Sequence, residues 1–146
     1  MIVLNDPEHP TDDNTAEIMT WRRVYPGHPD QAPKIRHFVA CLLTDFPFVD
    51  DIVNATAELV ANALRHTRSG KPGGHLTIEV RRWPGCCVTL AVTDQGSPDA
   101  PHVPQRANDD LFEETGRGLM ILDAISSCWG WHGDTRGRTV TALFIG

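Results

Sequence analysis

Two neighbouring stretches of alternating apolar and polar residues constrain the fold of this chain most strongly. Apolar side chains occupy every second position in each stretch: Leu76, Ile78 and Val80, then Val88, Leu90 and Val92. Such alternation gives a β-strand one apolar face and one polar face. Because Trp83-Pro84-Gly85 separates the stretches, residues 75–82 and 86–93 are predicted to form an antiparallel hairpin with one buried face.

Alternation in two further regions predicts more strands. Residues 18–25 alternate up to a Pro-Gly turn, and residues 129–132 and 139–145 flank a glycine-containing turn as a closing hairpin. About five strands are therefore expected.

Three regions have apolar residues at the three- and four-residue spacing of an amphipathic helix. They cover residues 30–43, 50–69 and 118–125. Asp30 is the expected N-cap of the first helix, and Asp50 or Asp51 that of the second. The elements do not follow a repeating strand–helix–strand order, which indicates an α+β fold. We expect a two-layer sandwich in which helices cover one face of a mixed, mostly antiparallel sheet.

The chain is predicted to contain one domain behind a short tail. Residues 1–16 are polar and include two prolines, which is typical of a flexible segment. The remaining residues, 17–146, are enough for a single hydrophobic core.

Charge and hydropathy narrow the classes of partner. The net charge of −6 argues against direct nucleic-acid binding, which needs a concentrated basic surface. No segment has the roughly 18 uninterrupted apolar residues of a membrane helix, so no membrane contact is expected. The N-terminal residues lack the features of a signal peptide, and a cytoplasmic location is expected.

The four cysteines show no metal-binding or disulfide pattern. They are Cys41, Cys86, Cys87 and Cys128, without a C-x-x-C pair. We expect buried free thiols and no structural metal.

Three polar residues recur at four-residue spacing in the second predicted helix. Glu58, Asn62 and His66 share one helical face, whereas Leu59 and Val60 point towards a core. Such spacing alone also describes the solvated side of any amphipathic helix. Asparagine is nevertheless unfavourable inside a helix, because its side chain competes for backbone hydrogen bonds. This helix therefore contains a candidate base and a candidate metal ligand.

Two glycine-containing motifs follow along the chain. Asp94-Gln95-Gly96 ends a predicted strand, where a carboxylate can accept a hydrogen bond from an exocyclic amine such as adenine N6. Gly116-Arg117-Gly118-Leu119 opens the third helix, whose amides and dipole favour bound phosphates. Each motif alone is equally compatible with an ordinary turn. P-loop, dinucleotide-binding and protein-kinase motifs are missing from the sequence, so an ATP site would be of another kind.

The order and spacing of the three motifs resemble those of the GHKL ATPase superfamily. In that resemblance they are the N box, the G1 box and the G2 box. It covers roughly residues 17–146 and is greatest with the anti-sigma-factor serine kinases, which have a histidine-kinase-like ATPase domain. Arg138 is a departure, because lysine or threonine is commoner in that family before the residue equivalent to Thr139.

The resemblance implies a Mg²⁺-ATP site. Asn62 would coordinate Mg²⁺, Asp94 would hold adenine with Gly96 packed beneath it, and Thr139 would assist through water. His66 would also belong to the ATP site. The phosphates would be wrapped by the G2 residues Gly116, Arg117, Gly118 and Leu119. Arg106 or Arg117 would neutralise the γ-phosphate, and the sequence does not choose between them.

Two further roles follow from the same resemblance. Glu58 would be the general base that orients a serine or threonine hydroxyl, or water, for in-line attack. Arg36, on the first helix, matches an arginine that faces the protein partner. A solvated helix residue is an equally good interpretation of Arg36.

Three functions are consistent with the sequence. The first is an anti-sigma factor and serine kinase that phosphorylates a STAS-type anti-anti-sigma protein and thereby controls a sigma factor. The second is a non-catalytic ATP-gated protein-binding module. The third is a detached histidine-kinase catalytic domain, which is disfavoured because no phospho-acceptor helix hairpin precedes the ATP domain. Retention of Glu58 favours the first, and a homodimer remains open.

Overall fold

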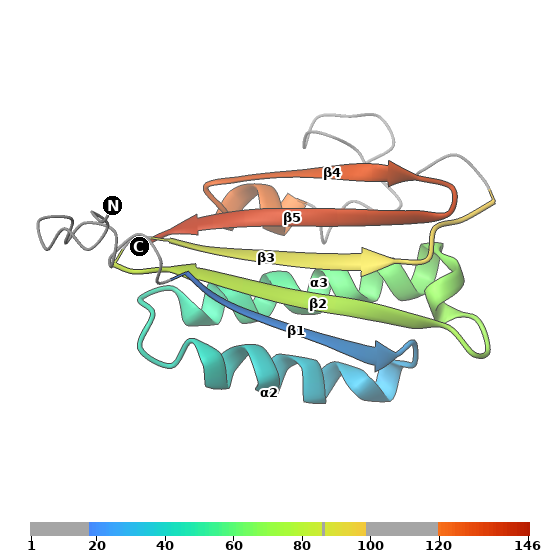
Figure 1. Cartoon of the computed structure of the whole chain (residues 1–146), viewed down its shortest axis with the longest axis horizontal. Coiled ribbons are helices and arrows are strands. Elements are labelled where there is room, and N and C mark those ends of the chain that lie inside the picture. The colour runs from blue at the N-terminus through green and yellow to red at the C-terminus, as the bar shows by residue number, and fades with distance from the viewer. Residues whose placement is uncertain (1–17, 86, 99–119) are drawn as a thin grey trace, which may run out of the picture.

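The computed structural model describes residues 18–85, 87–98 and 120–146 and has two layers (Figure 1). One layer is a five-stranded sheet, and the other contains two helices that cover one of its faces. This arrangement confirms the α+β sandwich predicted from the sequence. The tail at residues 1–16 lies outside the described residues.

The sheet has the spatial order β1-β2-β3-β5-β4. Its strands are β1 (Met19–Pro26), β2 (His75–Trp83), β3 (Cys87–Asp94), β4 (Cys128–Asp134) and β5 (Gly137–Ile145). The predicted hairpin is confirmed as β2 and β3, with Val80 opposite Leu90. Every pairing between the described strands is antiparallel, whereas a mixed sheet was expected.

The helices are α2 (Ala32–Leu42) and α3 (Val49–His66), and residues 120–125 are also helical. The predicted N-caps were wrong. Asp30 lies in the short helix η2 (Pro29–Gln31), where its backbone N–H donates to His28 Nδ1 at 3.2 Å. Asp50 and Asp51 lie inside the first turn of α3. There their carboxylates stabilise the helix through its dipole rather than through a cap.

The hydrophobic core fills the space between the sheet and the helices. Residues with at most 2% of their surface exposed come from both layers, namely Ile35, Val39, Ile52, Leu59, Ile78, Leu90 and Phe144. Alternation in the strands and three- and four-residue spacing in the helices place these side chains on facing surfaces. Their burial is the main source of stability.

Polar side chains occupy the other face of the sheet, and none of the described helices covers it (Figure 1). Thr77, Glu79, Thr93 and Thr141 line a shallow depression there.

The cysteines differ from expectation. Cys41 and Cys128 are free and exposed, and Cys87 is partly buried. The prediction of buried thiols was therefore wrong for the first two. Separately, none of the helices in the described ranges has both the length and the apolar character needed to cross a membrane.

Matched substitutions at two isoleucines test the core assignment. Ile78 is fully buried on β2, whereas Ile145 is 56% exposed at the end of β5. Ile78→Ala is expected to lower the free energy of unfolding by about 2–5 kcal/mol because it leaves a cavity. Ile145→Ala should change it by less than about 1 kcal/mol. Urea unfolding of both variants measures the difference, and equal losses would contradict the proposed core.

Candidate functional site

Helix α3 carries Glu58, Asn62 and His66 at four-residue spacing, which places them along one face of the helix. Leu59, Val60 and Ala63 are buried in the core, which fixes the rotation of the helix. Glu58 and His66 are partly exposed, but Asn62 is buried with 9% of its surface exposed. The solvated-face interpretation therefore does not fit Asn62.

The amide oxygen of Asn62 is buried and has no hydrogen-bond partner among the described residues. An unsatisfied buried acceptor costs about 1–3 kcal/mol, so each such atom in a folded protein needs an explanation. A neutral amide oxygen suits Mg²⁺, which commonly takes one or two protein ligands and completes its shell with phosphate oxygens and water. No cluster of three or more His, Cys, Asp or Glu side chains that could hold a metal occurs in the described ranges. The single amide oxygen of Asn62 fits an ion that takes few protein ligands.

Asp94 ends β3, and its side chain folds back onto the following loop. It is 7% exposed, and its Oδ1 accepts a hydrogen bond from the backbone N–H of Gly96 at 2.7 Å. Gly96 has a φ angle of +75°, which glycine adopts without strain. A Cβ atom at this position would lie 2.3 Å from the carbonyl oxygen of Thr135. Glycine is therefore required both by the φ angle and by the close approach of the β4–β5 turn.

Arg68, just after α3, joins three separate segments. Its backbone N–H donates to the Gly96 carbonyl at 2.7 Å. Its Nη1 donates to the carbonyls of Thr135 at 2.7 Å and of Gln95 at 3.1 Å. No local pattern in the sequence identifies Arg68 as a site residue, because its partners are distant in the chain. Its position two residues after His66 was the only local signal.

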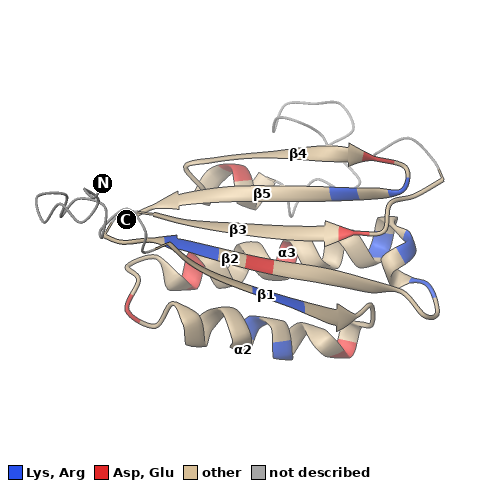
Figure 2. Ribbon diagram, viewed as in Figure 1, with Lys and Arg blue, Asp and Glu red and all other residues tan. Residues whose placement is uncertain are grey.

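A buried arginine faces Asp94 from the neighbouring strand. Arg138 on β5 pairs with Asp94 in the sheet register, and only 2% of its surface is exposed. Its Nε lies 3.7 Å from Asp94 Oδ1. The acidic end of β3 and the basic start of β5 thus lie side by side (Figure 2). In the sequence, Arg138 differs from the residue that is commoner at this position, but this difference alone does not place it in the site.

Burial raises the pKa of the Asp94 carboxyl group above its ordinary value. The Gly96 N–H and the positive charge of Arg138 oppose this shift without cancelling it. Because the pKa of Asp94 is higher in the folded protein, its carboxyl group stabilises the fold at pH values below the unfolded-state pKa. This stabilisation is lost as the pH rises through the folded-state pKa. Ionisation of this carboxyl group in the folded protein therefore costs stability.

Thr139 does not join this group of residues. Its hydroxyl lies 2.8 Å from that of Thr93, its partner in the register, and both line the polar depression on the uncovered sheet face. Successive residues of a strand point to opposite faces, so Arg138 and Thr139 cannot both face Asp94. Arg138, and not Thr139, therefore lies on the same side of the sheet as the Asp94 side chain.

The remaining expected residues are not brought together by the described structure. Arg36 is partly buried on α2, which carries basic residues (Figure 2). Arg106 and the G2-type residues Gly116, Arg117, Gly118 and Leu119 lie outside the described residues.

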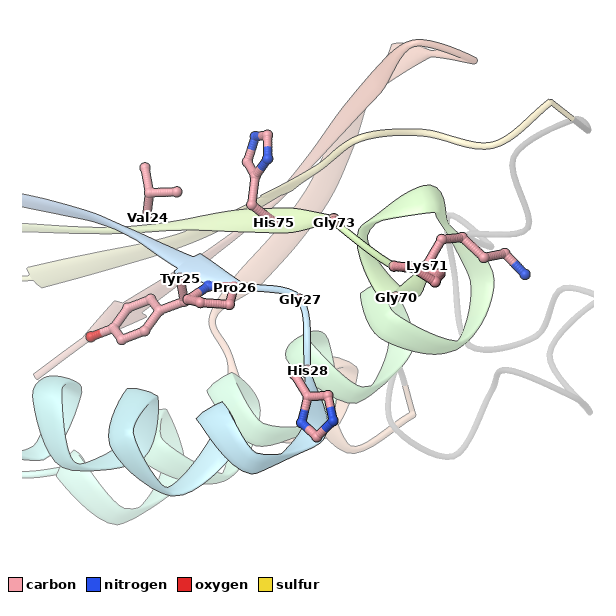
Figure 3. A pocket seen from close by; sticks show the side chains of 11 residues that line it. Val24, Tyr25, Pro26, Gly27, His28, Gly70, Lys71, Gly73 and His75 are labelled. Carbon is pink, nitrogen blue, oxygen red and sulfur yellow. The ribbon is translucent and has the colours of Figure 1, made fainter.

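Two surface pockets lie near this region. One of about 300 Å³ is lined by His66 together with Arg65, Arg68 and Lys71, so it is basic. Another, of about 820 Å³, lies between the end of β1 and the turn before β2. Around it the side chains of His28, Lys71 and His75 point away from one another (Figure 3). They do not converge on a common point as ligand-binding groups would.

Comparisons with known proteins identify the family of the chain and a similar fold. Residues 25–144 match the model of the family described as a histidine kinase-like ATPase domain. A chain in the crystal structure of the SiaB–SiaC complex from Pseudomonas aeruginosa is similar in fold, with a TM-score of 0.63 and 15% identity. The similarity covers 97% of this chain and 96% of the other. No curated protein sequence matches the chain.

A pair of glycine substitutions separates backbone strain from steric contact at Gly96. Gly96 and Gly73 have similar φ angles of +75° and +81°, but a Cβ at Gly73 would meet no described atom within 4 Å. Gly73→Ala should cost about 1 kcal/mol of unfolding free energy, from the φ angle alone. Gly96→Ala should cost at least about 2 kcal/mol more, because the Thr135 backbone must move. Chemical denaturation of both variants tests this, and equal costs would show that the contact is unimportant.

Proposed function

This chain belongs to the histidine kinase-like ATPase family, and we propose that it binds Mg²⁺-ATP and acts as an anti-sigma factor and protein serine kinase. Its substrate would be a STAS-type anti-anti-sigma protein. The observation that carries the proposal is the buried amide oxygen of Asn62, which has no hydrogen-bond partner among the described residues and lies on the helix that also presents Glu58. The similar chain comes from a structure in which two proteins, SiaB and SiaC, form a complex. This supports the proposal that the present chain also binds a protein partner.

Each described residue has a role suited to its environment. Asp94, buried at the end of β3, would accept a hydrogen bond from the exocyclic amine of adenine, and the Gly96 backbone would lie against the base. Asn62 would hold Mg²⁺, which when bound supplies positive charge to the phosphate oxygens. Arg68 positions this region by tying the end of α3 to Gly96.

Glu58 is suited to act as the general base. It lies one helical turn before Asn62 and is partly exposed, so a partner hydroxyl can reach it. The hydroxyl oxygen would form a bond to the γ-phosphorus as the bond to the bridging oxygen of ADP breaks. Glu58 would accept the hydroxyl proton.

The alternative function is an ATP-gated binding module, which would use Asn62 and Asp94 without transferring phosphate.

Two asparagines on the same helix provide a matched test of the metal site. Asn54 is exposed two turns before the buried Asn62. Asn62→Ala should reduce Mg²⁺-dependent ATP affinity at least about tenfold, because a buried charge-assisted contact is lost. Asn54→Ala should leave it unchanged. Both variants should fold, since alanine is the better helix former. Calorimetry with ATP, with and without Mg²⁺, gives the result. Unfolding of the Asn62 variant alone would instead indicate a structural role.

Glu58→Gln separates the kinase from the binding module. The amide keeps the shape of the side chain but cannot accept the proton, so phosphorylation of STAS proteins should fall by about 10²–10⁴-fold. ATP affinity should change little. Asp50→Asn, in the first turn of the same helix, makes the same charge change as a control. Transfer of labelled phosphate is the measurement. A wild-type protein that binds a sigma factor only with ATP, yet phosphorylates no partner, would favour the gated module.

A further inference from the structure

The charged side chain of Arg138 is almost completely buried. Its side chain is 1% exposed, and within the described part of the chain neither Nε nor Nη1 has a hydrogen-bond partner. A buried guanidinium is costly unless its donors are satisfied. The remainder of the same strand face consists of the apolar residues Val140, Ala142 and Phe144. An arginine at the end of such a row needs a partner that the described residues do not supply.

Asp94 does not fully satisfy this arginine. The distance of 3.7 Å from Arg138 Nε to Asp94 Oδ1 exceeds hydrogen-bond length. The same oxygen already accepts the Gly96 N–H at 2.7 Å. Donors of Arg138 and an acceptor of Asp94 therefore lie side by side in one buried layer, held there by the β3–β5 register.

We propose that Arg138 reads the nucleotide base together with Asp94. The proposal rests on ATP binding at this site. Adenine presents its exocyclic amine beside a ring-nitrogen acceptor, N1 on one edge and N7 on the other. Asp94 accepts from the amine, and the Arg138 guanidinium donates to the neighbouring ring nitrogen. The base thereby satisfies Arg138 donors that have no hydrogen-bond partner among the residues described in the structure.

Analogues of ATP that lack one ring nitrogen test this contact. In 1-deaza-ATP and 7-deaza-ATP a C–H group replaces N1 or N7. The wild-type protein should bind one of the two about 10- to 100-fold more weakly than ATP, as expected for a lost hydrogen bond to a charged donor. In Arg138→Met, that analogue and ATP should bind with affinities within about threefold of each other. The identity of the affected analogue shows which edge is read.

Arg136→Met is the matched control, because Arg136 lies two residues earlier with an 89% exposed side chain. It should keep the wild-type preference for ATP over the affected analogue. Calorimetry on the full-length protein measures each affinity, and thermal unfolding checks that each variant is folded. If Arg138→Met does not fold, Arg138→Lys replaces it, and its shorter point-charge side chain should reduce the same preference at least about threefold.

Two results would overturn the inference. One is a wild-type protein that binds both analogues as tightly as ATP. The other is a preference of unchanged size when Arg138 is replaced. In either case ATP binding itself stands, and only the role of Arg138 fails. A wild-type protein that binds no ATP overturns the proposed function and this inference together.

Discussion

Gly96 contacts the segment that follows α3, the end of β3 and the β4–β5 turn. Its carbonyl accepts from Arg68, its N–H donates to Asp94, and the Thr135 carbonyl lies where a Cβ would be. These contacts hold the end of the helix against the end of the strand. The relative position of the Asn62 and Asp94 side chains depends on this junction, since one lies on each of the joined elements.

The candidate site places polar groups within an otherwise apolar layer. Asn62, Asp94 and Arg138 are all buried, and two of them have open hydrogen-bonding atoms among the described residues. Burial of such groups lowers stability, and the surrounding core of aliphatic side chains offsets the loss. Proteins keep costly polar groups of this kind mainly at functional sites. The buried polar residues that lower stability are therefore the same residues that we propose bind the nucleotide and its metal ion.

Most of the fold was predictable because its signals are local. Alternation identified β2 and β3, and Val80 lies opposite Leu90 as a simple hairpin requires. The helix caps were less predictable, because several nearby residues can begin a helix and the surrounding turns decide among them. Asp30 is an example. It was expected to cap α2, but it lies within the short helix Pro29–Gln31 that precedes α2.

The sequence by itself determined the periodicities of the strands and helices, and with them the helical face shared by Glu58, Asn62 and His66. Only the tertiary structure decided that Arg138, and not Thr139, faces Asp94, because a shift of one residue in a strand reverses the face. It also decided the role of Arg68, whose hydrogen bond to Thr135 spans 67 residues of the chain. Local periodicity carries no information about such contacts, which arise only when the distant segments pack together.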